Sequence, residues 1–199
     1  MYGGVEYSMN QQTGGFWLNE LYRWLDPDLI ALSGVAADIL PNQPDKLLAM
    51  DAKSRVAKAV VVGGLFLNGD DLSNQTNVKL AQTYLGNPRV NAMWNRTKVG
   101  RVETRFRTSN SSEGWWIFAA HVFARNTGSS SGDVALFNYE PLERTFSIDL
   151  REIGKESHEQ NGAVTCVEIW EETKLQTVAG TVQTFVVPAR SSFLIECDW

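Results

Sequence analysis

Cysteine and histidine are scarce in this sequence: of its 199 residues, two are Cys and two are His. Two Cys are too few for the disulfide framework of a small secreted domain. Cys166 and Cys197 both lie in strand-like runs, so we expect two buried free thiols, which leaves the cellular compartment open. His121 and His158 stand far apart without Cys or acidic partners at ligand spacing, so no metal site is predicted.

Long apolar runs and clustered positive charge are also missing. The longest apolar run, Ala59 to Leu67, is interrupted by two glycines, whereas a membrane helix needs about 20 apolar residues. The first residues show neither the basic region nor the apolar stretch of a signal peptide. The formal net charge is −5 and the basic residues are scattered, so we expect neither a membrane nor a nucleic acid as partner. A Gly-rich phosphate loop and a nucleophile elbow are absent too, and no cofactor is predicted.

The sequence is rich in apolar and aromatic side chains. It is 43% hydrophobic and contains seven Trp, nine Phe and five Tyr. That composition predicts a globular protein with a sizeable core rather than a disordered chain. Helical and short apolar segments alternate up to about residue 95, and strand-like segments dominate after it. We therefore predict two parts, residues 1–95 and residues 96–199.

The first part has the pattern of βα units. A buried strand is expected at 28–32, an amphipathic helix at 45–62, a second buried strand at 65–67 and a second helix at 76–85. Gly86 and Pro88 mark the end of the second helix. Strands that alternate with helices are typical of a parallel sheet or barrel.

The second part consists of short strand-like segments separated by turn residues. The expected strands are 100–108, 114–124, 134–139, 145–150, 164–170, 181–187 and 192–197. Phe146 and Ile148 alternate with Ser147 and Asp149, which is the period of a strand with one buried face. Strands of this number and spacing predict a β-sandwich.

A resemblance to a known family rests first on the segment Trp24-Leu25-Asp26-Pro27-Asp28. It resembles the Trp-Asn-Asp-Pro-Asp segment at the seventh barrel strand of the α-galactosidases and α-N-acetylgalactosaminidases, glycoside hydrolase families 27 and 36. Leu25 departs from the Asn of that pattern. The later segments that follow in the family's order are 65–72, 87–91 and 134–138. The resemblance implies an α+β chain, in which a partial (β/α)8-barrel remnant is followed by an antiparallel β-sandwich.

The resemblance also implies a sugar site. Asp28 would form a wall of the pocket and bind sugar hydroxyls, and Asp26 would support the loop. The plainer interpretation is that both belong to a strand-entry turn around Pro27. Trp17, Tyr22 and Trp24 have flat apolar faces suited to stacking on a pyranose, and packing between elements is the alternative for each of them. The partner that the resemblance implies is a carbohydrate, an α-galactoside.

No catalytic residue is predicted in the chain. Retaining glycosidases use two carboxyls about 5–5.5 Å apart, and the family carries both on earlier barrel strands, for which no matching segment precedes Gly14. Asp26 and Asp28 share one loop and would approach a sugar from one side, so they do not fit the pair. The resemblance implies a retaining α-galactosidase-like parent enzyme, with its acids on a missing N-terminal barrel segment or on an oligomeric partner. The alternative is a non-catalytic carbohydrate-binding or structural β-sandwich module.

Two further acids, Asp70 and Asp71, follow the second strand of the first part. Barrel enzymes gather their sites at this end of the strands. The two side chains line the rim of a pocket or form a solvated turn, and the turn is the favoured interpretation.

Overall fold

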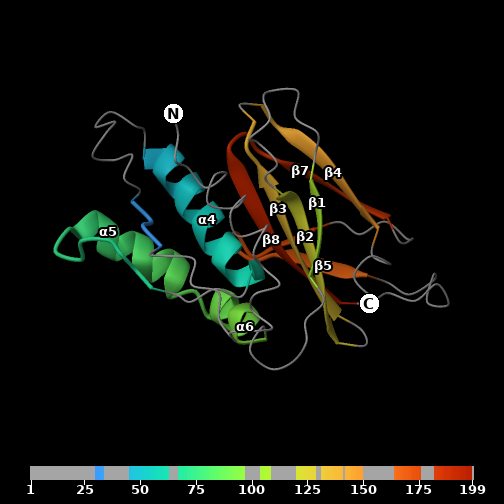
Figure 1. Cartoon of the computed structure of the whole chain (residues 1–199), viewed down its shortest axis with the longest axis horizontal. Helices are drawn as coiled ribbons and strands as arrows, with labels where there is room; N and C mark the ends of the chain where they lie inside the picture. The colour runs from blue at the N-terminus through green and yellow to red at the C-terminus, as the bar shows by residue number, and fades with distance from the viewer. Residues whose placement is uncertain are drawn as a thin grey trace.

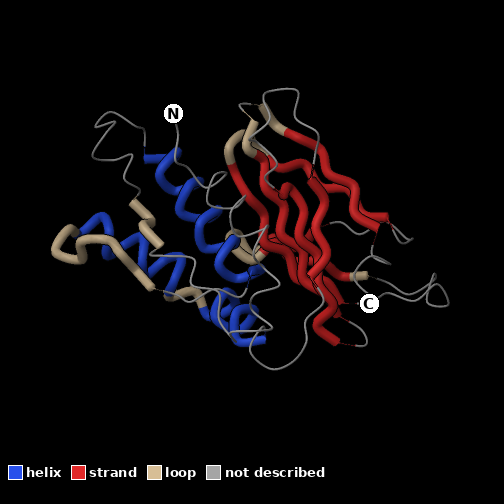
Figure 2. The backbone as a smooth tube through the Cα atoms, viewed as in Figure 1, coloured by secondary structure: helices blue, strands red, loops and turns tan. Residues whose placement is uncertain are grey.

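The computed structural model describes residues 30–33, 45–62, 67–96, 104–108, 120–128, 131–140, 142–149, 164–175 and 182–198. Within these ranges the protein has three layers (Figures 1 and 2): helices, a six-stranded sheet and a two-stranded sheet. The helices cover one face of the large sheet and the small sheet lies against the other. The protein is therefore α+β with a β-sandwich, as predicted.

The helical layer is formed by α4 (Asp45–Val62), α5 (Gln75–Leu80) and α6 (Pro88–Arg96). The helix expected at 45–62 is confirmed. The helix expected at 76–85 is present as α5 followed by the single π-helical segment η1 (Ala81–Leu85). None of the helices that the structure describes is long and apolar enough to cross a membrane.

Helix α6 was not predicted, because Pro88 was interpreted only as a stop signal. Pro88 is instead the first residue of α6, a position where a missing backbone N–H costs nothing. The side-chain oxygen of Asn87 caps the helix by accepting the backbone N–H groups of Arg89 at 2.9 Å and Val90 at 3.3 Å. Gly86 allows the chain to turn here, since a Cβ at that position would lie 2.5 Å from the carbonyl oxygen of Gln82.

The large sheet has the strand order β1-β2-β3-β8-β5-β6, and all neighbouring strands are antiparallel. The strands are β1 (Thr104–Thr108), β2 (Ala120–Gly128), β3 (Ser131–Asn138), β5 (Thr165–Glu168), β6 (Thr173–Leu175) and β8 (Ser191–Asp198). The prediction of a strand as far as residue 170 was wrong, because the chain turns after Glu168. The Glu168 carboxylate accepts the backbone N–H groups of Trp170 and Glu171 and so fixes the turn that leads into β6.

The small sheet pairs β4 (Arg144–Asp149) with β7 (Val182–Val187). Its side chains alternate between buried and exposed, as the sequence pattern predicted: Phe146 and Ile148 face inward from β4, and Phe185 and Val187 face inward from β7. These four side chains form one half of the sandwich core.

Strand β3 is buried on both faces, which accounts for its lack of alternation. Val134 and Leu136 belong to the core between the two sheets. Ala135 and Phe137 belong to the core beneath the helices. A strand covered on both sides reads as a continuous apolar run.

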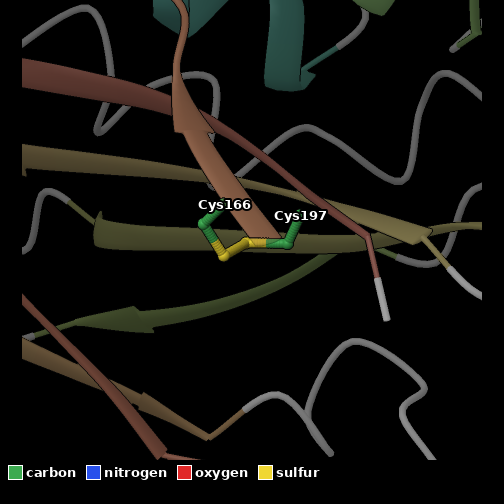
Figure 3. Close-up of a disulfide and its surroundings, with 2 residues drawn as sticks. All are labelled: Cys166 and Cys197. Carbon is green, nitrogen blue, oxygen red and sulfur yellow. A yellow bond between two sulfur atoms is a disulfide. The ribbon is translucent and has the colours of Figure 1, made fainter. Parts of the chain in front are cut away.

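The two cysteines form a disulfide (Figure 3), so the expectation of free thiols was wrong. Cys166 on β5 lies directly opposite Cys197 on β8, with 4.2 Å between their Cα atoms. The sequence alone did not reveal the pairing, because the two cysteines are 31 positions apart and only the register of β5 on β8 brings them together.

Candidate functional site

The described ends of the two strands predicted in the first part lie side by side and run parallel. The described portions meet at a bridge between Ile30 and Asn68. The Ile30 N–H donates to the carbonyl oxygen of Leu67 at 2.7 Å, and the Gly69 N–H donates to the carbonyl oxygen of Ile30 at 3.1 Å. Ile30 is buried in the core that the helices share with the large sheet. The carboxyl-terminal ends of both segments therefore emerge at the same edge.

Asp70 joins these two ends. One carboxylate oxygen accepts the Leu32 N–H at 2.7 Å, and the other accepts the Ser33 N–H at 3.0 Å and the Ser33 hydroxyl at 2.6 Å. The Asp70 N–H donates to the side-chain oxygen of Asn68 at 3.0 Å, which holds the acid in place. We call Ser33, Asn68 and Asp70 the strand-end clamp. Asp70 is thus bonded to the neighbouring segment and is more than part of a solvated turn.

Asp71 has a different, local role. It is exposed, and its carboxylate accepts the Ser73 N–H at 2.9 Å. Hydrogen bonding from Ser73 lowers the pKa of Asp71 below its usual value. Its backbone carbonyl accepts the Asn74 N–H and the Asn77 side chain, so the residue leads the chain into α5. This agrees with the turn that the sequence favoured.

The clamp gives a direct prediction. Replacing Asp70 by Ala leaves the buried Leu32 N–H without its partner and removes three hydrogen bonds to a carboxylate, so we expect the free energy of unfolding to fall by about 2–3 kcal/mol. Urea denaturation measures the change. Asp71→Ala is the matched control, because its exposed carboxylate bonds only within its own turn, and it is expected to leave stability nearly unchanged. Equal effects of the two substitutions would contradict the clamp.

The residues predicted to contact sugar, Trp17, Tyr22, Trp24, Asp26 and Asp28, lie outside the described residues. Their roles therefore stay predictions. Along the chain they precede Ile30, so the segment that carries them leads directly into the strand-end clamp.

The sequence analysis missed the partnership of Ser33 and Asp70. The available signal was that each follows a short apolar strand, Ser33 after 28–32 and Asp70 after 65–67. Residues at the same end of neighbouring parallel strands come together. The identity of the hydrogen-bonded atoms, however, depends on which strands are neighbours.

Glu168 is a buried carboxyl group in the sandwich, far along the chain from the clamp. Burial raises the pKa of Glu168, while the N–H groups of Glu171 and Trp170 and the charge of Lys53 oppose that rise. Raised carboxyl pKa values are typical of catalytic acids. Here the hydrogen bonds are made to the residue's own turn, at 3.1 Å and 2.9 Å, which is a structural role.

His121 on β2 is buried, and its ring lies against those of Tyr139 and Phe146. Its Nδ1 is 3.0 Å from the carbonyl oxygen of Phe137, to which it donates when that nitrogen carries the proton. Burial lowers the pKa of His121, the bond to Phe137 opposes that shift, and the nearby Arg144 guanidinium adds to it. Among the residues that the structure describes, no group of three His, Cys, Asp or Glu side chains is placed to hold a metal ion.

The fold is similar to those of solved glycoside hydrolases, although no protein-family profile and no curated protein matches the sequence. A GH27 β-L-arabinopyranosidase from Geobacillus stearothermophilus superposes with a TM-score of 0.69 at 15% identity, over 98% of this chain and 42% of that enzyme.

Two further enzymes give similar values. For a putative α-N-acetylgalactosaminidase from Bacillus halodurans the TM-score is 0.62 at 15% identity, over 98% of this chain and 45% of that protein. For α-galactosidase I from Mortierella vinacea it is 0.60 at 13% identity, over 87% and 39%. The chain thus spans less than half the length of each enzyme and resembles their C-terminal portion in fold.

Proposed function

We propose that this chain is the C-terminal part of a retaining α-galactosidase-like glycoside hydrolase. It contributes part of the sugar pocket and leaves the nucleophile and the acid/base to polypeptide outside these 199 residues. The observation that carries the proposal is the parallel pair at Ile30 and Asn68, with its ends joined by Asp70. In a (β/α)8 barrel the carboxyl-terminal ends of the strands surround the active site. The likeness in fold to solved glycoside hydrolases supports the same conclusion.

In this proposal residues 1–95 are the last units of the barrel. Asp28 precedes Ile30 by two residues and accepts hydrogen bonds from sugar hydroxyls, and Asp26 supports its loop. Trp17, Tyr22 and Trp24 supply apolar faces for the pyranose ring. The strand-end clamp fixes where the Asp28 strand ends, and a fixed position is what a hydroxyl-binding carboxylate requires.

The chain by itself is not expected to hydrolyse a glycoside. Retention of configuration needs one carboxylate to attack the anomeric carbon and a second carboxyl group to protonate the leaving oxygen. These groups stand on different sides of the scissile bond. Asp26 and Asp28 come from one short segment and reach a bound sugar from one direction.

The partner in this proposal is the polypeptide that carries the remaining barrel strands. The N–H and the C=O of Ile30 bond to the backbone of Leu67 and Gly69. In a parallel ladder, the N–H and C=O of Asn68 therefore point away from Ile30, towards the other edge of its segment. That edge takes a further parallel strand. Leu67 and Leu72, close to it in sequence, are 44% and 54% exposed, and apolar side chains of this size gain from being covered. An oligomeric partner that supplies such a strand is the second form of the proposal.

Titration of D-galactose into the purified chain tests the pocket. We expect binding that Asp28→Asn weakens at least tenfold, because an amide replaces a charged acceptor of hydroxyl protons. Asp71→Asn, a matched change at an exposed acid, is expected to leave the affinity unchanged. Galactose binding that is insensitive to Asp28→Asn would instead favour a carbohydrate-binding sandwich module, and no binding to the unaltered chain would count against the pocket.

Activity is tested separately with a nitrophenyl α-galactoside. The purified 199 residues are expected to release no nitrophenol above the buffer rate. Measurable turnover by the purified chain would place the catalytic acids within it and would contradict the proposal that they lie on other polypeptide.

A further inference from the structure

The β5–β6 hairpin is attached to the rest of the large sheet through β8 alone among the described strands. Strand β5 has four residues, and each of them pairs with one residue of β8, from Thr165 opposite Asp198 to Glu168 opposite Ile195. Cys166 and Cys197 form the second pair of this short ladder. The disulfide is therefore placed where four residue pairs hold a hairpin at the end of the sheet.

The turn of the same hairpin contacts the helical layer. The Glu171 carboxylate pairs with the Lys53 ammonium of α4 at 2.6 Å. The Trp170 ring meets the Tyr84 ring edge to face, with 5.6 Å between centroids. Ile169 is fully buried in the core beneath the helices. The hairpin thus connects the disulfide to α4 and η1.

We propose that the Cys166–Cys197 disulfide is a redox-dependent fastener, through which the β5–β6 hairpin holds α4 against the sandwich. When the sulfurs are bonded, the ladder with β8 cannot open, and the turn stays beneath the helices. When they are reduced, only the four residue pairs with β8 and the contacts of the turn itself hold the hairpin, and its turn leaves α4 more readily. This inference does not depend on the proposed function, since it concerns only how firmly α4 is held against the sandwich.

The fastener forms by thiol–disulfide exchange with a small disulfide such as oxidised glutathione. A thiolate of one cysteine attacks a glutathione sulfur and releases one reduced glutathione. The thiolate of the second cysteine then attacks the mixed disulfide and releases another. Two thiol protons are lost, two electrons pass to the oxidant, and one sulfur–sulfur bond has replaced another.

Both cysteines are fully buried in the folded protein. Exchange consequently requires the hairpin to open, and an intact fold protects the bond from reductants. The Cys166–Cys197 disulfide therefore forms during folding or while the hairpin is open. The chain therefore acquires it where disulfide oxidants are present, in the kind of compartment where disulfides persist.

Hydrogen exchange of the backbone amides, followed by mass spectrometry, tests the fastener. The chain is compared in oxidised form and after reduction by dithiothreitol in mild urea and transfer to native buffer with reductant. We expect exchange of α4 amides in the segment 56–61 to become at least tenfold faster on reduction. Strand β2, on the far side of the sheet from β5 and β6, is expected to change less than threefold.

A variant separates this coupling from a general loss of stability. Trp170→Ala removes the ring that meets Tyr84 and leaves the disulfide in place. In this variant α4 should exchange faster already in the oxidised form, and reduction should add little. An equal acceleration in α4 and β2, no acceleration in either, or an undiminished redox effect in Trp170→Ala would each overturn the proposal.

Discussion

Replacing Asn138 by Asp is expected to lower the free energy of unfolding by roughly 3–5 kcal/mol or to prevent folding. Asn138 is 1% exposed at the end of β3. Its side-chain nitrogen donates to the carbonyl oxygens of Leu142, Val187 and Pro188 at 2.8, 3.1 and 3.0 Å. A carboxylate has the same shape but no hydrogen to donate. A carboxylate oxygen would therefore face the three carbonyl oxygens in a buried site, with no hydrogen between them.

The cost is large because these three bonds join separate parts of the sandwich. Val187 ends β7 in the small sheet, and Leu142 belongs to the connection between β3 and β4. The side-chain oxygen of Asn138 also accepts the Glu140 N–H at 3.0 Å. One amide therefore fixes both the start of the crossover to the small sheet and the return from it.

Urea denaturation at pH 7 measures the effect, with Asn74→Asp as the matched control. Asn74 is exposed and caps α5 by accepting the Thr76 N–H at 2.8 Å. Asp is as good an N-cap as Asn, so this variant should keep the stability of the original chain. Lowering the pH should partly restore the Asn138→Asp variant, because a protonated carboxyl regains one donor. A loss at Asn138 no greater than the change at Asn74 would show that the three bonds contribute little.

Removing the disulfide is expected to have the second large effect. The bond closes a loop in which 31 positions separate the cysteines, and chain entropy predicts a stabilisation of about 3–4 kcal/mol for a loop of this length. The variant with Cys166→Ala and Cys197→Ala should lose about that amount. The size depends on the model of the unfolded chain, so the measured quantity is the difference between the two proteins under one set of conditions.

Reductant supplies the control for this second prediction. With dithiothreitol present throughout unfolding, the original chain should approach the stability of the double variant, and the double variant should not respond. If the original chain is equally stable with and without reductant, its cysteines are free thiols. The inference about the β5–β6 hairpin would then fail as well.

Local patterns predicted much of the fold. The alternation of Phe146 and Ile148 with polar neighbours gave β4, whose inward face forms part of the sandwich core. The helix at 45–62 followed from its apolar spacing and is observed over the same residues. Signals carried by single residues were less reliable, since Pro88, interpreted as a stop signal, is the first residue of α6. Strand β6 went unpredicted because three residues, two of them exposed, show no period.

The candidate site, like the fold, was predicted from the sequence only in part. The sequence named the segment that ends at Asp28 through a family resemblance, and the roles of its residues stay predictions. It did not find the clamp, in which Asp70 binds the backbone of Leu32 and Ser33 across 38 and 37 positions. Nor did it find Asn138 as the junction of three segments. Each of these partnerships depends on which strands lie next to each other.

By itself, then, the sequence determined the helix at 45–62, the alternation along β4 and the β-sandwich. These follow from spacings of two, three or four residues, which act within one strand or one turn of helix. The tertiary structure alone decided that Cys166 meets Cys197, that Asp70 holds Ser33 and that the turn after Glu168 reaches α4. Such contacts are set by strand order and register: a shift of one residue along β5, for example, would turn the Cys166 side chain to the opposite face.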